Sequence, residues 1–202
     1  MGLAERVEFI LVTKHPENPE QGIFQSHQHC LQQGLATGAR RILIFEDDVV
    51  FRDHAFHRRL EEACRALNEE QGWEALFLGC ISQGSHKTRT KSLRKIRYRC
   101  LAHAYALNRP LAGRLAREPW SGIPFDELLR RYRPQGYALF PMCAFQGEAS
   151  SDNHTVSVDR LRRLLGGLAF IQRANELYQN HRLLLLLVPA ALLLAILLGL
   201  GR

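Results

Sequence analysis

The sequence lacks the cysteine patterns on which small metal-binding or disulfide-linked folds depend. It has five cysteines, an odd number, and they are widely spaced with no C-x-x-C pair. Neither a zinc ribbon nor a disulfide framework is supported, and we expect free thiols in a reducing compartment. We also expect no N-terminal signal peptide, because Met1–Glu8 holds three charges and no apolar core.

Acidic residues are missing from residues 86–99, which instead carry seven basic ones: Lys87, Arg89, Lys91, Arg94, Lys95, Arg97 and Arg99. The whole chain has a net charge of +7, so this single patch accounts for the excess. A local patch weakens the case for general nucleic-acid binding, and we expect no nucleic-acid partner. The patch could be a mobile loop that closes over phosphates, an arm attracted to anionic lipid headgroups, or a solvated charged face.

The long hydrophobic run of this sequence lies near its C-terminus, where Leu183–Leu200 holds eighteen residues without a charge. A helix of that length spans about 27 Å, enough for the core of a bilayer. Basic residues gather before the run and only Arg202 follows it, so the positive-inside rule places the main domain on the cytoplasmic side. We expect residues 183–200 to be a single-pass transmembrane anchor, with a buried core helix as the alternative. Residues 155–182 would be a basic amphipathic juxtamembrane helix or linker.

The rest of the chain, residues 1–154, is expected to form one domain in which short apolar runs alternate with helical patterns. This alternation is typical of an α/β fold with a mostly parallel sheet flanked by helices. Strands are predicted at residues 7–12, 42–45, 73–79, 100–107 and 135–140. The main helices are predicted at residues 23–35, 54–68 and 125–132.

Three consecutive carboxylates, Glu46, Asp47 and Asp48, directly follow the apolar run Ile42–Phe45. Acids at the end of a buried strand are costly unless their charge is compensated. Ligands of open α/β sheets bind beyond the carboxyl ends of strands, so a divalent cation is the favoured compensation. Strand alternation puts Glu46 and Asp48 on one face and Asp47 on the other, a spacing that suits a cation shared with substrate phosphates. The alternative is that the acids cap the next helix or pair with arginines.

Several motifs, in order, resemble glycosyltransferase family 25, the lipopolysaccharide biosynthesis type. They cover about residues 7–154 and read GIFQSHQHCLQQGL, LIFEDDVVF, FLGC, HAYALNR, PFDELL and YALFPMCAFQGEASSDN. The resemblance implies a glycosyltransferase-A-like, Rossmann-like fold and a divalent metal, Mn²⁺ or Mg²⁺. It also implies transfer with inversion from a nucleotide-sugar donor, a UDP-sugar, to a cell-envelope glycan or glycolipid acceptor such as lipopolysaccharide.

The resemblance also assigns roles to individual residues. Its acidic metal and diphosphate site corresponds to Glu46, Asp47 and Asp48. The residues that it places near the donor nucleotide sugar are Ser26, His27, Asp47 and His103.

Two carboxylates are candidates for the general base that activates the acceptor hydroxyl. The resemblance favours Asp126, on its later acidic helix, and Asp152, in its closing Ser-Asp pair, is the alternative. One carboxylate at a helix start is chemically sufficient, provided that it reaches the hydroxyl.

The start of the chain departs from the family pattern, because VEFILVTKHPE lacks the usual Asn-Leu and Arg-rich loop after the first strand. Two other functions therefore stay open. One is a catalytically inactive, membrane-tethered binding protein of glycosyltransferase type. The other is a metal-dependent phosphoryl-transfer enzyme or nuclease, which would bind nucleic acid through residues 86–99 with a steep salt dependence.

Overall fold

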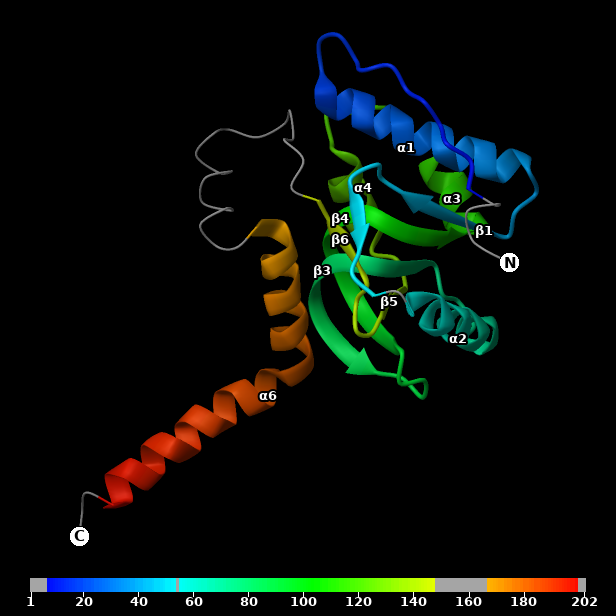
Figure 1. The fold of residues 1–202 in the computed structure, drawn as a ribbon. Helices are drawn as coiled ribbons and strands as arrows, with labels where there is room; N and C mark the ends of the chain where they lie inside the picture. The colour runs from blue at the N-terminus through cyan, green and yellow to red at the C-terminus, as the bar shows by residue number, and fades with distance from the viewer. Residues whose placement is uncertain (1–6, 54, 148–166, 200–202) are drawn as a thin grey trace.

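The computed structural model describes residues 7–53, 55–147 and 167–199, and these residues form an α/β fold (Figure 1). The helices are α1 (Pro19–Ala36), α2 (Phe56–Glu69), α3 (Arg109–Leu115), α4 (Phe125–Tyr132) and α6 (Gly167–Gly199). The strands are β1 (Arg41–Phe45), β2 (Val49–Phe51), β3 (Ala75–Lys87), β4 (Leu93–Asn108), β5 (Gly136–Leu139) and β6 (Ala144–Gln146). The α/β class is therefore as predicted.

The main sheet is mixed, so the prediction of a mostly parallel sheet is wrong. Its strand order is β1-β4-β3-β5, and β2 pairs with β6 in a separate two-stranded sheet. Only the β3–β5 pairing is parallel among the described strands. The physical reason is the short connection between β3 and β4. Parallel neighbours need a crossover of a dozen or more residues, whereas a turn of five residues can only return the chain antiparallel.

The basic segment, residues 86–99, spans the end of β3, the five-residue turn and the start of β4, so most of it belongs to this hairpin and not to a long loop. Along the start of β4, Ile96 and Tyr98 are buried, while Lys95, Arg97 and Arg99 are exposed. The ring of Tyr98 stacks on Phe77 of β3, with the ring centroids 4.4 Å apart. One face of the hairpin thus belongs to the core, and the other presents cations to solvent.

Two apolar clusters hold the helices to the sheet. The first joins α1, α3 and α4 to the sheet, and its large members include Phe24, Leu31, Tyr105, Leu111, Leu115 and Phe125. The second joins α2 to the sheet and to the β2–β6 pair, and its members include Leu67, Trp73, Leu76, Leu78 and Ala144. Figure 1 shows α1 and α3 together on one side of the main sheet and α2 apart from them.

The first predicted strand is absent, because Val7–Val12 takes part in no sheet. Phe9 and Leu11 are 86% and 97% exposed. Its β-branched and aromatic composition favours a strand, but a strand needs a neighbour to receive its backbone hydrogen bonds. Regular structure begins instead at α1, where the Asn18 side chain accepts a hydrogen bond from the Gln21 N–H (3.1 Å) and proline occupies the first turn.

The prediction of a C-terminal transmembrane anchor at residues 183–200 is wrong. No helix in the described part of the chain is both long enough and apolar enough to cross a membrane. The predicted anchor is the distal part of α6, which begins at Gly167 and is interrupted by non-helical dihedrals at His181. The kink at His181 divides α6, so residues 183–199 are only the second part of a longer helix whose first part packs on the domain. The cytoplasmic-side localisation and the membrane partner inferred from the anchor lose their basis with it.

The first half of α6 is docked on β3 through polar side chains. The Asn175 amide accepts from the Ser82 N–H (3.0 Å) and donates to the Ser82 carbonyl (3.1 Å). One turn on, Gln179 accepts from the Gly84 N–H (2.7 Å), and Asn180 accepts from the Ser85 hydroxyl (2.8 Å). Each bond satisfies a backbone or hydroxyl group that would otherwise lack a partner.

Glu176 on the same helix face is 5% exposed and receives the Met142 N–H at 2.7 Å. Burial raises its pKa above the ordinary value, although the bonds from Met142 and Arg173 oppose the rise. A carboxyl whose pKa is raised on folding binds its proton more tightly in the folded state. Its charge therefore costs stability above the unfolded pKa, and that cost disappears as the pH falls.

We expect the Glu176→Gln variant to be more stable than the parent at pH 7–8 by an amount on the order of 1 kcal/mol. The amide keeps an oxygen for the Met142 N–H but carries no charge to desolvate. The gain should shrink as the pH is lowered toward 4, which urea unfolding at several pH values will measure. A variant less stable than the parent at neutral pH would show that the ion pair with Arg173 outweighs burial.

Candidate functional site

The acidic triplet lies in a turn at the carboxyl end of β1. The Glu46 N–H donates to the His103 carbonyl of β4 (2.9 Å), which continues the ladder by one residue, and the Val49 N–H then bonds back to the Glu46 carbonyl (3.3 Å). Glu46 and Asp48 are half-buried, whereas Asp47 is exposed. The carbonyl of Asp48 is held in turn by the Gly147 N–H at 2.8 Å, just beyond β6. Backbone bonds to β4 and to Gly147 thus fix the turn on both sides.

Glu46 is anchored by a buried histidine on α1. His27 Nε2 donates to Glu46 Oε1 (3.2 Å), and the Tyr105 hydroxyl lies 2.9 Å from His27 Nδ1. The imidazole is 5% exposed and stacks on the Phe125 ring at 4.2 Å between centroids. Burial alone would raise the pKa of Glu46. The hydrogen bond from His27 and the electrostatic influence of His27 and His103 outweigh burial and hold that pKa below its ordinary value.

The pKa of Asp48 is shifted in the opposite direction, above its ordinary value. Burial raises its pKa, the neighbouring Glu46 and Asp47 carboxylates raise it further, and a hydrogen bond from Gln146 and the nearby His103 only partly oppose them. Its buried Oδ1 has no hydrogen-bond partner within the described residues. Burying this oxygen without a partner costs free energy, and a cation bound to it would compensate that cost.

His103 is the second polar group here without a partner. Its side chain is 1% exposed, and neither ring nitrogen has a hydrogen-bond partner among the residues that the structure describes. The ring lies against Gly79 of β3, where a Cβ atom would come within 2.8 Å of Nε2. Buried unpartnered histidines are uncommon, and two unsatisfied groups next to the same acids mark this turn as a place where a ligand would gain hydrogen bonds.

The site does not form a complete metal cage by itself. Within the described ranges, no group of three or more His, Cys, Asp or Glu side chains is arranged to hold a metal ion. Glu46 and Asp48 offer two half-buried carboxylates, and Asp47 faces solvent. Mg²⁺ and similar cations are commonly bound by one or two carboxylates together with substrate phosphates. The residues present fit a cation of that kind only if phosphate oxygens complete its coordination.

The structure places two of the other predicted site residues, Ser26 on α1 and Asp126 at the start of α4. Ser26 precedes His27 on α1, and its hydroxyl donates to the Gly22 carbonyl (2.8 Å) within the helix. Asp126, at the start of α4, accepts from the Tyr98 hydroxyl and from the Leu101 N–H (2.9 Å). Asp152 lies outside the described residues.

Both carboxylate oxygens of Asp126 are thus engaged in holding β4. One of these bonds comes from the N–H of Leu101, which lies within β4. Leu101 has a φ of 73°, in the left-handed region that residues other than glycine rarely adopt. Burial raises the pKa of Tyr98 well above its ordinary value, and Asp126 raises it further, so the phenol stays a donor. As a general base, Asp126 would have to accept the hydroxyl proton on a lone pair that these two bonds leave free.

Sequence reasoning missed Tyr105 and Phe125, the two residues that hold the His27 ring. One signal was available for Tyr105, which follows His103 by two residues in a predicted strand and therefore shares its face by alternation. No comparable signal marks Phe125, because the stacking partner of a histidine is fixed by how α4 packs on α1.

No family model matches the chain. Over 61 residues the chain is 39% identical to the inactive glycosyltransferase 25 family member 3 of Mus musculus, and 38% identical to the probable inactive member 3 of Rattus norvegicus. The matched segment is 30% of this chain but spans only 10% of the length of each of these relatives. The chain thus has partial homology to glycosyltransferase family 25, through members that are named inactive.

Among solved structures, the fold is similar to the crystal structure of A197 from STIV. The two share 14% sequence identity with a TM-score of 0.46, over 71% of this chain and 74% of that one. A likeness at this level says nothing about function.

Proposed function

We propose that the chain is a nucleotide-sugar-binding domain of the family 25 type, which transfers a sugar from a UDP-sugar to a hydroxyl of a glycan acceptor. One observation carries the proposal. At the end of β1 a carboxylate held ionised by a buried histidine, Glu46, stands beside Asp48, whose buried oxygen has no partner. The order of the sequence motifs and the partial homology to family 25 support it. The donor, the acceptor and the inversion are expectations from the resemblance.

Glu46 and Asp48 would hold a divalent cation, Mn²⁺ or Mg²⁺, together with the donor diphosphate. A bound cation supplies charge stabilisation to the leaving diphosphate. The chain's own contribution is to keep Glu46 ionised and to orient both carboxylates. His27 does so for Glu46, through a ring fixed by Tyr105 and Phe125, and the backbone bond from Gly147 holds the Asp48 turn.

His103 is suited to contact the donor directly. It offers two ring nitrogens without a partner in the described residues, and its side chain is almost fully buried beside the acidic turn. A buried imidazole can donate to a phosphate oxygen or a sugar hydroxyl with little competition from solvent. The general base, Asp126 or Asp152, stays a prediction.

A second candidate is a catalytically inactive domain that binds nucleotide sugars without transferring them. Two observations favour it: the relatives are named inactive, and both oxygens of Asp126 accept hydrogen bonds that hold β4. Binding and catalysis are therefore tested separately.

We expect a UDP-sugar to raise the melting temperature of the protein only when Mn²⁺ is present. At a ligand concentration of 100 Kd the gain is about 2.7 kcal/mol, which corresponds to roughly 5–10 °C for a chain of this size. A thermal-shift screen of UDP-sugars with Mn²⁺ or with EDTA measures it. Release of UDP in the presence of a glycan acceptor then separates a transferase from an inactive binder. If no nucleotide sugar shifts the transition with Mn²⁺ present, both proposals are wrong.

A further inference from the structure

A second set of contacts joins α6 to the start of β6, in addition to its bonds to β3. The Gln172 amide donates to the Ala144 carbonyl (2.9 Å), and the Glu176 carboxylate accepts from the Met142 N–H (2.7 Å). Both of these α6 side chains are buried. They lie four residues apart and therefore on one face of the helix. That face of α6 holds the backbone on either side of Cys143.

The residues that follow in β6 hold the acidic turn. β6 pairs antiparallel with β2, which begins directly after Asp48, and Gln146 lies opposite Val49. The Gln146 side chain forms a hydrogen bond with the Asp48 carboxylate, and the Gly147 N–H donates to the Asp48 carbonyl (2.8 Å). A Cβ atom at Gly147 would lie 2.8 Å from that carbonyl oxygen, so the two backbones are in close contact. The orientation of Asp48 therefore depends on the position of β6.

The Ala144 carbonyl is the point at which α6 and the sheet meet β6. It lies against Gly79 of β3, where no Cβ atom fits, and it accepts from the Gln172 amide. The buried Oε1 of Gln172 has no hydrogen-bond partner among the described residues. Burying a polar atom without a partner costs free energy, so it is the N–H side of this amide that stabilises the contact.

We propose that Gln172 is a positioning residue of the acidic site. By fixing the Ala144 carbonyl it holds β6 in place, and β6 in turn holds Asp48 through Gln146 and Gly147. What the positioned carboxylate binds rests on the proposed function, whereas the link from α6 to Asp48 belongs to the unliganded chain. The two can therefore be tested apart.

The Gln172→Met variant removes the amide donor while keeping the length of the side chain. It also removes the oxygen without a partner, so the unfolding midpoint in urea should stay close to that of the parent. In the unliganded variant we expect the Gly147 amide to exchange its hydrogen with solvent about fivefold faster, the factor for losing one hydrogen bond. NMR of the full chain measures this rate. A Gly147 rate equal to that of the parent would overturn the proposal.

Isothermal titration calorimetry with UDP in the presence of Mn²⁺ measures the effect on the site. The affinity should fall about tenfold in Gln172→Met, as is typical when a residue that supports a metal ligand is replaced. An affinity equal to the parent's, despite faster exchange at Gly147, would overturn the positioning role. If the parent does not bind UDP with Mn²⁺, the proposed function is wrong, and the Gly147 rate alone decides whether α6 holds the acidic turn.

Asn175→Ala is the matched control on the same helix. It removes two hydrogen bonds between α6 and Ser82 (3.0 and 3.1 Å), but these are made to β3 and not to β6. Exchange at Gly147 and the affinity for UDP should both stay near the parent values. If Asn175→Ala accelerates Gly147 as much as Gln172→Met does, docking of the whole helix is responsible, and the role assigned to Gln172 is wrong.

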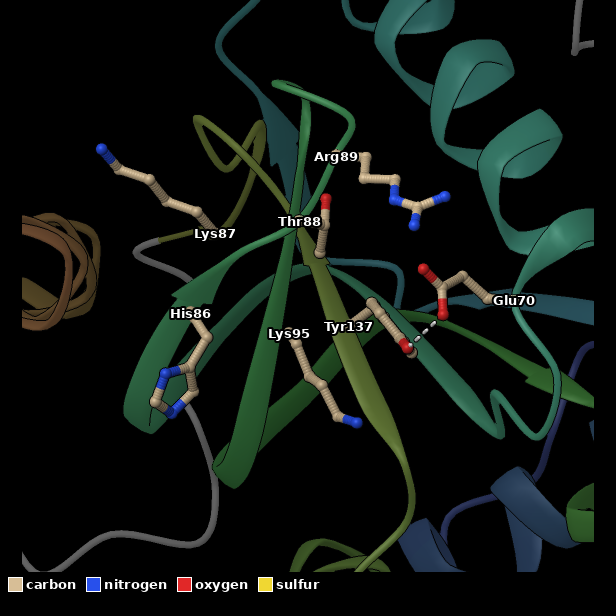
Figure 2. Close-up of a pocket in the computed structure, with 7 residues that line it drawn as sticks. All are labelled: Glu70, His86, Lys87, Thr88, Arg89, Lys95 and Tyr137. Atoms are coloured by element: carbon tan, nitrogen blue, oxygen red, sulfur yellow. Dashed lines mark hydrogen bonds between the residues drawn. The ribbon is translucent and has the colours of Figure 1, made fainter.

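Tyr137→Phe is the control for losing a hydrogen bond elsewhere without a change of shape. Figure 2 shows its side chain near the turn of the β3–β4 hairpin, where the hydroxyl donates to Glu70 (3.3 Å). This variant should leave the Gly147 amide unaffected, and equal acceleration in Tyr137→Phe would overturn the proposal.

Glu176→Ala tests the same link should Gln172→Met fail to fold. It removes the acceptor of the Met142 N–H, so exchange at Gly147 should again be faster than in the parent. Glu176→Gln, which keeps an oxygen for that N–H, should retain the parent rate. Unchanged exchange in Glu176→Ala would then overturn the proposal.

Discussion

Replacing Gly79 with alanine is expected to cost about 4 kcal/mol or more, or to prevent folding. A Cβ atom at this position would lie 1.9 Å from the Ala144 carbonyl oxygen and 2.8 Å from His103 Nε2. The obstacle is backbone, which cannot rotate away as the end of a side chain can. Ala144, the first residue of β6, must therefore move away from β3. The hydrogen bond from the Cys143 N–H to the Leu78 carbonyl (3.0 Å) would be lost in that movement.

Urea unfolding of the parent and the variant measures this loss. Gly113→Ala is the control, because Gly113 lies inside α3 with open space around its Cβ position. Alanine there should stabilise the protein by about 0.5–1 kcal/mol. An unfolding midpoint of Gly79→Ala equal to that of the parent would mean that residues 143–146 do not pack over β3 as described.

The Asp48→Asn variant is expected to fold normally and to lose Mn²⁺-dependent binding of a UDP-sugar, by about 100-fold or more. The amide keeps the size of the side chain and removes the charge that a cation needs. Since the pKa of Asp48 is raised by burial and by Glu46, the charge is a cost to the unliganded fold. Removing it should leave the melting temperature without ligand equal or slightly higher.

Thermal shift with and without Mn²⁺ and a UDP-sugar provides both measurements in one experiment. Glu61→Gln, which removes an exposed carboxylate on α2 from a pair with Arg65 at 3.6 Å, is the control and should respond to ligand as the parent does. An Asp48→Asn variant that still shows the full Mn²⁺-dependent shift would exclude Asp48 as a cation ligand.

The elements that the sequence predicts correctly are those that a short run of neighbouring residues determines. The helix at residues 125–132 has the bounds that the sequence predicts, and the apolar run before Glu46 is a strand, although only its alternate residues Ile42 and Ile44 are buried. The start of β4 was also predictable, but the interpretation of residues 86–99 considered only their charge. Ile96 and Tyr98 alternate with Lys95, Arg97 and Arg99, and this period of two is typical of a half-buried strand.

What could not be predicted depends on distant partners. Val7–Val12 has the composition of a strand, but whether it pairs is decided by the sheet and not by its own residues. The bond from His27 to Glu46 joins residues nineteen positions apart, and the Tyr105 hydroxyl that completes it lies seventy-eight positions from His27.

The amide side chains that join α6 to β3 have a further consequence for how the protein behaves in solution. The backbone groups of Ser82 and Gly84 face outward from the hairpin, where an open strand could pair with another molecule. Asn175 and Gln179 occupy those groups, so a helix takes the place of a neighbouring strand. The polar face of α6 therefore covers an edge of β3 that could otherwise pair with a strand of another molecule and lead to aggregation. The residues at these positions must match the hydrogen-bonding geometry of the strand, which an apolar side chain could not do.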